Sequence, residues 1–228
     1  MMNGDITEHS DKTTTVGMWK DEYRLKIKNI TFSNDLSNLP SSCTEANLCW
    51  DITDSESIYP VYHYLVQNVA DTTKYDAYIV SEEKIYAPKD SSGIFALYGE
   101  ESGSYVSYVE TINFNNNFDT SKVTNMYAMF GGINASGDMH LKEIKVSDKF
   151  VTDNVTDMLE MFRLCKYLNF TFNVTGNKVT NYTNIFSNTA TDPNAKIIVN
   201  YTAETETLVD NMLATVASTS NVVKGKQI

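Results

Sequence analysis

The chain has 228 residues, and 42% of them are hydrophobic, so it is long enough and apolar enough to bury a core. It carries 29 acidic and 18 basic residues, a formal net charge of −11, with the basic residues scattered along the sequence. Such a charge repels phosphate backbones, which argues against nucleic acid as a partner. No apolar run approaches the roughly 20 residues that a membrane-spanning helix needs.

The first segment, residues 1–17, is polar, rich in threonine and without hydrophobic periodicity. These properties predict a flexible leader. The segment also lacks the basic-then-apolar order of a signal peptide. Because a chain can be given without its removed signal or its anchor, this absence does not place the protein inside a cell.

The pattern changes at Met18. Residues 23–32, YRLKIKNITF, alternate apolar and polar side chains with one irregularity, which predicts a strand. Four further predicted strands are separated by polar turns and cover residues 49–52, 59–66, 75–80 and 84–87. We therefore expect a β-rich N-terminal capping domain over residues 18–108.

A repeated phrase dominates the next region. VTNMYAMF (residues 123–130) returns as VTDMLEMF (155–162) and, more loosely, as VTNYTNIF (179–186). In the first two copies Val, Met, Met and Phe stand at i, i+3, i+6 and i+7, which would place them on one stripe of a helix. Each copy is therefore predicted to be a short helix.

Each copy follows a short alternating stretch that predicts a strand. These stretches cover residues 110–114, 142–146 and 168–172, and a fourth, 196–200, closes the series. One strand–turn–helix unit cannot bury its apolar face alone, whereas stacked units can. The pattern thus predicts a short leucine-rich-repeat-like solenoid over residues 109–202.

The last segment, residues 203–228, is predicted to be a C-terminal capping helix and tail. Apolar side chains recur between Leu208 and Val216, and Glu204 and Glu206 suit the positive end of a helix dipole. With its strands and repeated helices, the chain as a whole is predicted to have an α+β fold.

Two stretches carry a family resemblance. FDTSKVTNMYAMF (residues 118–130) and VTDMLEMFRLCKYLNF (155–170) resemble the repeats of the BspA-like leucine-rich repeat surface proteins of bacteria, described as a domain of unknown function 285. The resemblance implies a secreted or surface-exposed bacterial protein that makes adhesive or other extracellular contacts with a protein or a glycan. A structural spacer without a ligand of its own is the alternative.

No catalytic motif stands out in the sequence. His9, His63 and His140 lie far apart, and no nucleophile elbow, phosphate-binding loop or calcium loop is present. We therefore expect a protein that is not an enzyme and that binds no metal and no cofactor.

The three cysteines have separate interpretations. Cys43 and Cys49 bracket a short polar segment and either form a disulfide in an oxidising compartment or remain free thiols. Cys165 lies in an apolar stretch and is expected to be a small buried core residue.

Two surfaces are candidates for binding a partner. The first consists of the polar residues that alternate with the buried positions of the repeat strands and must point away from the core: Thr111, Asn113, Glu143, Lys145, Asn169, Thr171 and Lys196. The second consists of Tyr98, Tyr105 and Tyr108, which flank a stretch of small residues, as in many recognition surfaces. These tyrosines alternatively only cover the open N-terminal edge of the repeats.

Overall fold

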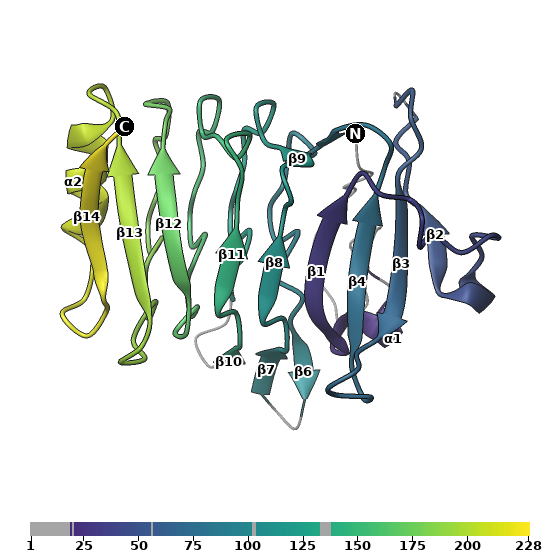
Figure 1. The fold of residues 1–228 in the computed structure, drawn as a ribbon. Coiled ribbons are helices and arrows are strands. Elements are labelled where there is room, and N and C mark those ends of the chain that lie inside the picture. Colours follow the sequence, from purple (N-terminus) through teal and green to yellow (C-terminus); the bar gives the residue numbers. More distant parts are fainter. Residues whose placement is uncertain (1–18, 20, 56, 102–103, 133–137) are drawn as a thin grey trace.

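A nine-stranded sheet runs through the molecule in the computed structural model (Figure 1), which describes residues 19, 21–55, 57–101, 104–132 and 138–228. The leader expected at residues 1–17 lies outside the described residues. The strands follow the order β14-β13-β12-β11-β8-β1-β4-β3-β2. Their bounds are β1 Ile27–Ser33, β2 Cys49–Asp51, β3 Tyr62–Gln67, β4 Tyr75–Val80, β8 Thr111–Asn113, β11 Glu143–Lys145, β12 Asn169–Val174, β13 Lys196–Tyr201 and β14 Val222–Gln227.

The sheet is mixed. All neighbours from β14 to β4 pair in parallel, whereas β3 pairs antiparallel with both β4 and β2. Strand β1 lies between β4 and β8. The sheet therefore passes without interruption from the expected capping domain to the repeat region.

The remaining elements are short. They are α1 (Asp21–Arg24), a 3-10 helix at Glu45–Asn47, β5 (Ile85–Tyr86), β6 (Gly99–Glu101), β7 (Ser104–Ser107), β9 (Phe118–Asp119), β10 (Asp138–Met139) and α2 (Glu206–Leu213). Strands β10, β7 and β6 form a small sheet, and β5 pairs with β9.

The strands lie where alternation of apolar and polar residues predicted them. Strand β4 covers the predicted residues 75–80, and β8, β11, β12 and β13 fall within or across the four alternating stretches of the repeat region. The irregularity in residues 23–32 is a register shift between Ile27 and Asn29, where β1 pairs with β4. Local alternation was therefore sufficient to find these strands.

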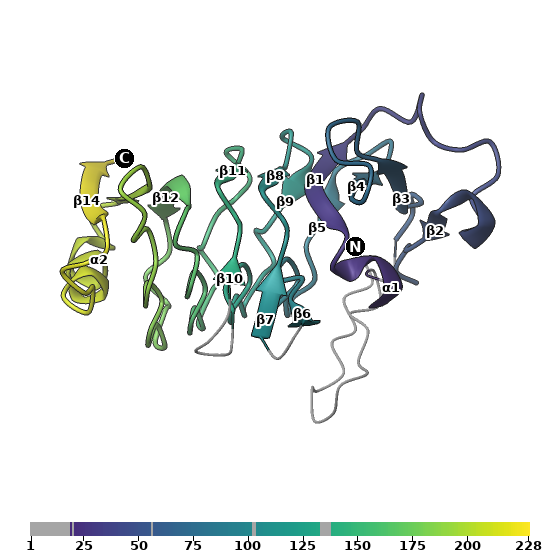
Figure 2. The ribbon, with the colours of Figure 1, turned by 90° about the horizontal axis from the view of Figure 1, so that it is seen from below.

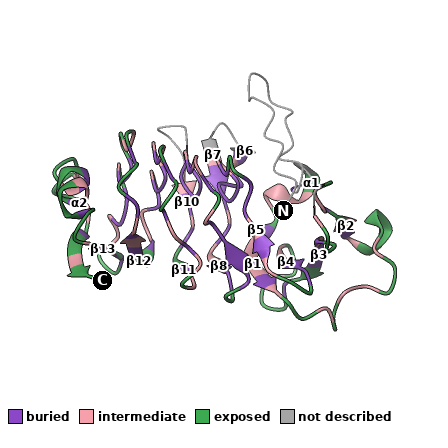
Figure 3. Cartoon of the chain, turned by 90° about the horizontal axis from the view of Figure 1, so that it is seen from above, coloured by how far each residue is buried: buried purple, intermediate pink, exposed green. Residues whose placement is uncertain are grey.

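The main core lies on one side of the sheet, which we call the inner face. The second residue of each repeat strand belongs to one continuous apolar cluster: Ile112, Ile144, Phe170 and Ile197. Their neighbours in each strand are less buried. Figure 3 shows buried, intermediate and exposed stretches interspersed along the chain. Each strand therefore separates a packing face from a polar face.

The prediction of a strand–turn–helix solenoid, and with it the α+β class, is wrong. Among the described residues the only α-helices are α1 and α2, and neither contains a copy of the repeated phrase. Residues 123–130 and 155–162 are turns joined to one another by one isolated parallel bridge, between Asn125 and Asp157. The described part of the fold is mostly β-structure.

Backbone hydrogen bonds explain this correction. In a helix each N–H group would bond to the carbonyl oxygen four residues earlier. Here alternate N–H groups of the phrase reach the next copy along the sheet instead. The N–H of Met126 donates to the carbonyl oxygen of Asp157 at 2.8 Å, and the N–H of Met158 donates to that of Asn181 at 2.7 Å. The i, i+3, i+6 and i+7 spacing thus reflects turns that direct Val, Met and Phe into the core.

An Asp or Asn side chain begins each turn. Isolated parallel bridges connect Asp90 to Asn125, Asn125 to Asp157, and Asp157 to Asn181. The side-chain oxygen of each of these residues accepts a hydrogen bond from the N–H two residues later, at 2.8–3.4 Å. Such bonds are typical of Asx turns and compete with helix formation.

The residue three positions after each Asp or Asn has a left-handed backbone. The φ angles are 62° at Gly93, 46° at Ala128, 56° at Glu160 and 56° at Asn184. A left-handed residue cannot continue a right-handed helix. Residues 89–95, KDSSGIF, therefore form a further copy of the same turn, which sequence reasoning placed before the repeats.

A column of phenylalanine rings connects the four turns through the core. Phe95 stacks on Phe130 at 5.6 Å between ring centroids, Phe130 stacks on Phe162 at 5.6 Å, and Phe162 stacks on Phe186 at 5.8 Å. The angles between successive ring planes are 14°, 9° and 5°. The phrase is therefore repeated because each copy supplies one ring to this column.

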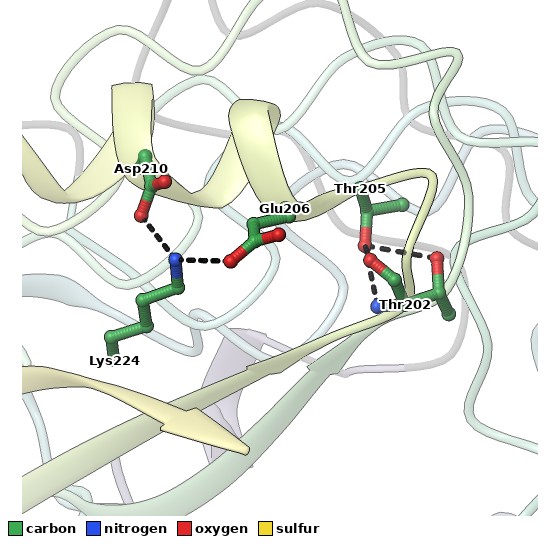
Figure 4. A network of polar contacts seen from close by, with 5 residues as sticks. All are labelled: Thr202, Thr205, Glu206, Asp210 and Lys224. Carbon is green, nitrogen blue, oxygen red and sulfur yellow. Dashed lines mark hydrogen bonds and ion pairs between the residues drawn. The ribbon is translucent and has the colours of Figure 1, made fainter. Parts of the chain in front are cut away.

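Helix α2 and strand β14 close one end of the core. Val209 and Met212 of α2 are buried in the core, and Lys224 of β14 contacts Glu206 at 3.0 Å and Asp210 at 2.7 Å (Figure 4). Hydrogen bonds to Asp210 and Glu206 raise the pKa of Lys224. The helix lies in the segment where it was predicted, but the expected tail contains a ninth strand of the sheet.

Candidate binding face on the sheet

The polar residues predicted to point away from the core do lie together on one surface, which we call the outer face. Thr111 pairs with Glu143, and Asn113 pairs with Lys145, across β8 and β11. Glu143 also pairs with Asn169 on β12. The other two predicted residues continue the face. Thr171 follows Asn169 on β12, and Lys196 on β13 pairs with Asn169.

Strands β1 and β4 extend this face with residues that sequence reasoning missed. Asn29 and Thr31 of β1 pair with Thr111 and Asn113 of β8. On its other side β1 pairs with β4, which places Asp76 beside Asn29 and Tyr78 beside Thr31. The alternation of these residues with buried Ile30, Phe32 and Ile79 indicates that they point away from the core. No local pattern in the sequence indicates that β1 pairs with β8.

A hollow of about 320 Å³ opens on the outer face over β4, β1, β8 and β11. Short side chains on β1 and β8 form its floor, and the longer side chains of Tyr78, Glu143 and Lys145 border it. The shape of the hollow therefore follows from the lengths of side chains on neighbouring strands.

A hydrogen-bond network fixes the polar groups on the β4 side of the hollow. The amide nitrogen of Asn68 donates to both carboxylate oxygens of Asp76, at 2.8 and 3.0 Å. The amide nitrogen of Asn29 donates to Asp76 at 2.7 Å, and the Thr111 hydroxyl donates to Oδ1 of Asn29 at 2.7 Å. These side chains are therefore oriented before any ligand arrives.

A second hollow, of about 540 Å³, continues along the same face. Glu143 and Lys145 line both hollows, and Asn169, Thr171 and Lys196 line the second. The Lys145 ammonium lies 3.3 Å from the Glu143 carboxylate, and both side chains are about half exposed, at 59% and 48%. The ion pair is thus a low ridge between two adjoining hollows.

The connection between β1 and β2 covers the end of the outer face over β3 and β4. In Figure 2 this connection is the long loop that arches out at the β2 end of the sheet. Leu36 and Leu39 pack there against a small cluster that contains Tyr64 and Tyr78. The two tyrosine rings stack at 5.0 Å with 10° between their planes. Tyr78 is thus held in place from one side and lines the hollow.

A disulfide holds this covering segment to the sheet. Cys43 and Cys49 are bonded, with 4.8 Å between their Cα atoms, and Cys49 is the first residue of β2. Of the two interpretations left open by the sequence, the structure has the disulfide. Cys165 is a buried free thiol, as predicted, and burial raises its pKa.

The three candidate tyrosines lie elsewhere. The ring centroids of Tyr98 and Tyr105 are 5.9 Å apart, and burial raises the pKa of Tyr98 to about 12. The Tyr108 hydroxyl donates to Glu101, and the ammonium of Lys74 lies 3.4 Å from the Tyr108 ring centroid. Tyr98 directly precedes β6 and Tyr105 lies in β7, so both are at the small sheet of β6, β7 and β10. None of the three tyrosines lines either hollow.

Side chains that could act in catalysis or bind a metal are dispersed in the part of the chain that the structure describes. No three His, Cys, Asp or Glu side chains gather there as metal ligands. His63 is buried against Trp19, whereas His140 lies 3.4 Å from Asp138. None of the described helices has the length and apolarity needed to cross a bilayer.

The comparison with known families decides one part of the resemblance. Residues 105–200 match the family model described as "Mycoplasma protein of unknown function, DUF285". This DUF285 region contains β8, β11, β12 and all three copies of the VT phrase. Residues 1–104 and 201–228 lie outside the match, and the BspA-like part of the resemblance stays a prediction.

No curated protein and no solved structure matches the chain. The DUF285 region supplies five of the nine residues that line the first hollow, because β1 and β4 lie outside it. The candidate face therefore combines the DUF285 region with the segment that precedes it.

Proposed function

We propose that the chain is a non-enzymatic module of a secreted or surface-exposed bacterial protein, and that its outer face binds an extracellular protein or glycan. The exposed polar outer face of β8, β11 and β12 carries this proposal. Side chains on that face are not needed for the core, yet some are fixed by hydrogen bonds to one another. Preorganised polar groups on a rigid sheet reduce the entropy lost when a partner binds.

The disulfide supports an extracellular setting, and the net charge narrows the class of partner. Disulfides persist in oxidising compartments, and the Cys43–Cys49 disulfide holds the segment that borders the face. The net charge of −11 disfavours nucleic acids and anionic membrane surfaces as partners.

Direct binding to host epithelial cells tests the proposal. Fluorescently labelled chain is expected to bind saturably, and the triple variant Asn113→Ala, Lys145→Ala, Thr171→Ala is expected to lose that binding. A matched control variant carries Asn211→Ala, Lys89→Ala and Thr207→Ala, which replace the same residue types at exposed positions off the face. Equal binding by both variants would exclude the outer face as the binding surface.

A structural spacer is the second candidate function. The continuous nine-stranded sheet and the phenylalanine column favour it, because both give a rigid body without requiring a ligand. The same assay separates the two functions. A spacer without a ligand shows no saturable binding to cells or to extracellular-matrix proteins.

A further inference from the structure

The first hollow has the size of a small-ligand site but an unusual lining. Its volume of about 320 Å³ lies at the lower end of the roughly 300–1,000 Å³ typical of such sites. Most small-ligand sites are lined mainly by apolar side chains. Here amides, hydroxyls, carboxylates and an ammonium predominate, so the complementary ligand is rich in hydroxyl groups.

The hollow offers both donors and acceptors that are still unused. Among the described residues, the Thr31 hydroxyl and the amide nitrogen of Asn113 have no hydrogen-bond partner in the protein, whereas Oδ1 of Asn113 accepts from the N–H of Asn115 at 3.1 Å. The Glu143 carboxylate, which forms an ion pair with Lys145, has the capacity to accept further hydrogen bonds. A ring bearing several hydroxyl groups can satisfy such a mixture.

Tyr78 adds an aromatic surface at the border of the hollow. One side of its ring is occupied by Tyr64, and the Tyr78 side chain also lines the hollow. An aromatic side chain combines a large apolar face with a polar hydroxyl. It therefore suits a ligand with one C–H-rich face and polar edges, as a pyranose ring has.

The charges and the backbone exclude other ligand classes. Two carboxylates, Asp76 and Glu143, face one ammonium, Lys145, which disfavours an anionic ligand. An extended peptide that adds to a sheet needs an unpaired strand edge. Every strand from β4 to β13 is paired on both sides, so the face over these strands offers no such edge.

We infer that the first hollow binds one ring of a neutral glycan, with the adjoining ring directed over the Glu143–Lys145 ridge into the second hollow. The inference rests on the proposed function and names its ligand class. Thr31 and Asn113 supply the hydrogen bonds that the protein leaves unused, Tyr78 supplies the stacking surface, and the Asp76 network keeps the floor rigid.

An NMR titration of the isotopically labelled chain with lactose, cellobiose and N,N′-diacetylchitobiose tests this inference. At least one of these disaccharides is expected to bind with a Kd on the order of 1 mM. It should shift the amide signals of residues 29–31, 76–78 and 111–113. Sialyllactose, which carries a carboxylate, is expected to bind more weakly than lactose.

Variants identify the site. The double variant Thr31→Val, Asn113→Ala is expected to weaken binding at least about tenfold, because it removes two polar contacts to the ring. Tyr78→Phe keeps the aromatic ring and is expected to keep most of the binding. The control variant Thr207→Val, Asn211→Ala makes the same replacements on α2 and should leave binding unchanged. Unchanged amide spectra far from the substitutions establish that each variant is folded.

Three results would overturn the inference: no signal shifts with any neutral disaccharide at about 50 mM, tighter binding of sialyllactose than of lactose, or equal binding by the double variant and its control. The cell assay separates this failure from failure of the proposed function. If cell binding survives glycosidase treatment but is lost in the outer-face triple variant, the proposed function stands and its ligand is a protein. If no cell binding occurs and no disaccharide binds, both fail.

Discussion

The phenylalanine column gives the most direct test of how the turns are stacked. Phe162 and Phe186 are fully buried or nearly so, and their parallel rings lie 5.8 Å apart. Replacing either ring with leucine keeps most of the apolar volume and is expected to cost about 1 kcal/mol. A stacked aromatic pair contributes about 0.5–1.5 kcal/mol beyond its burial. A double-mutant cycle with Phe162→Leu and Phe186→Leu should therefore give a coupling energy in that range.

Urea unfolding at a single pH measures the four free energies of unfolding in this cycle. The m-values scale with the surface area that unfolding exposes. They should stay unchanged, because a Phe→Leu replacement hardly alters that area. A second cycle with Phe162→Leu and Phe32→Leu is the control. Among the described residues, Phe32 on β1 contacts the column only through the distant ring of Phe95, at 5.9 Å, and should show almost no coupling to Phe162. A coupling energy below about 0.3 kcal/mol for the first pair would refute the stacked column.

Three further changes test other parts of the fold. Gly176→Ala would place a Cβ 2.4 Å and 2.5 Å from backbone atoms of residues 152–153, and urea unfolding should show a loss of about 1–3 kcal/mol or more. Replacing Cys43 and Cys49 with serine opens a loop with a sequence separation of 6, which should cost about 2 kcal/mol in the same assay, whereas no loss would contradict a stabilising disulfide. Burial raises the pKa of Tyr98 from 10.0 to about 12, so between these pH values the folded chain keeps a proton that the unfolded chain has lost. Stability should therefore fall as the pH rises across this window, and less steeply for Tyr98→Phe; equal slopes would contradict the assignment.

The outer face could be predicted because alternation is a local property. Once Ile112 and Ile144 are assigned to the core, Thr111, Asn113, Glu143 and Lys145 must point the other way. No knowledge of distant pairing is needed for that step. The sequence therefore located one side of the outer face correctly, whereas binding at this face stays a prediction.

The other side of the face depends on distant pairing and could not be predicted. Strand β1 inserts between β4 and β8, although 77 residues lie between the end of β1 and the start of β8 in the sequence. Only this insertion brings Asn29 beside Thr111 and Thr31 beside Asn113. Alternation alone gives each strand its two faces but not its neighbours.

The helix prediction failed because two structures share one apolar spacing. Val155, Met158, Met161 and Phe162 would form a helical stripe, yet an Asx turn followed by a left-handed residue buries the same four side chains. The residues that distinguish the two structures are Asp157 and its equivalents, whose side chains favour turns. Phrases of eight residues are also too short to be stable helices by themselves.

The residues that stabilise the fold and the residues proposed to bind a partner lie on opposite faces of the sheet. Residues of the repeated phrase face the core, so their replacement alters stability, whereas Asn113, Lys145 and Thr171 project from the opposite face of the same sheet. Lys145 and Thr171 are exposed, and substitutions at such positions usually change stability by less than about 0.5 kcal/mol. Binding specificity can therefore vary on the outer face while the repeated phrase, which fixes the turns and the ring column, stays the same.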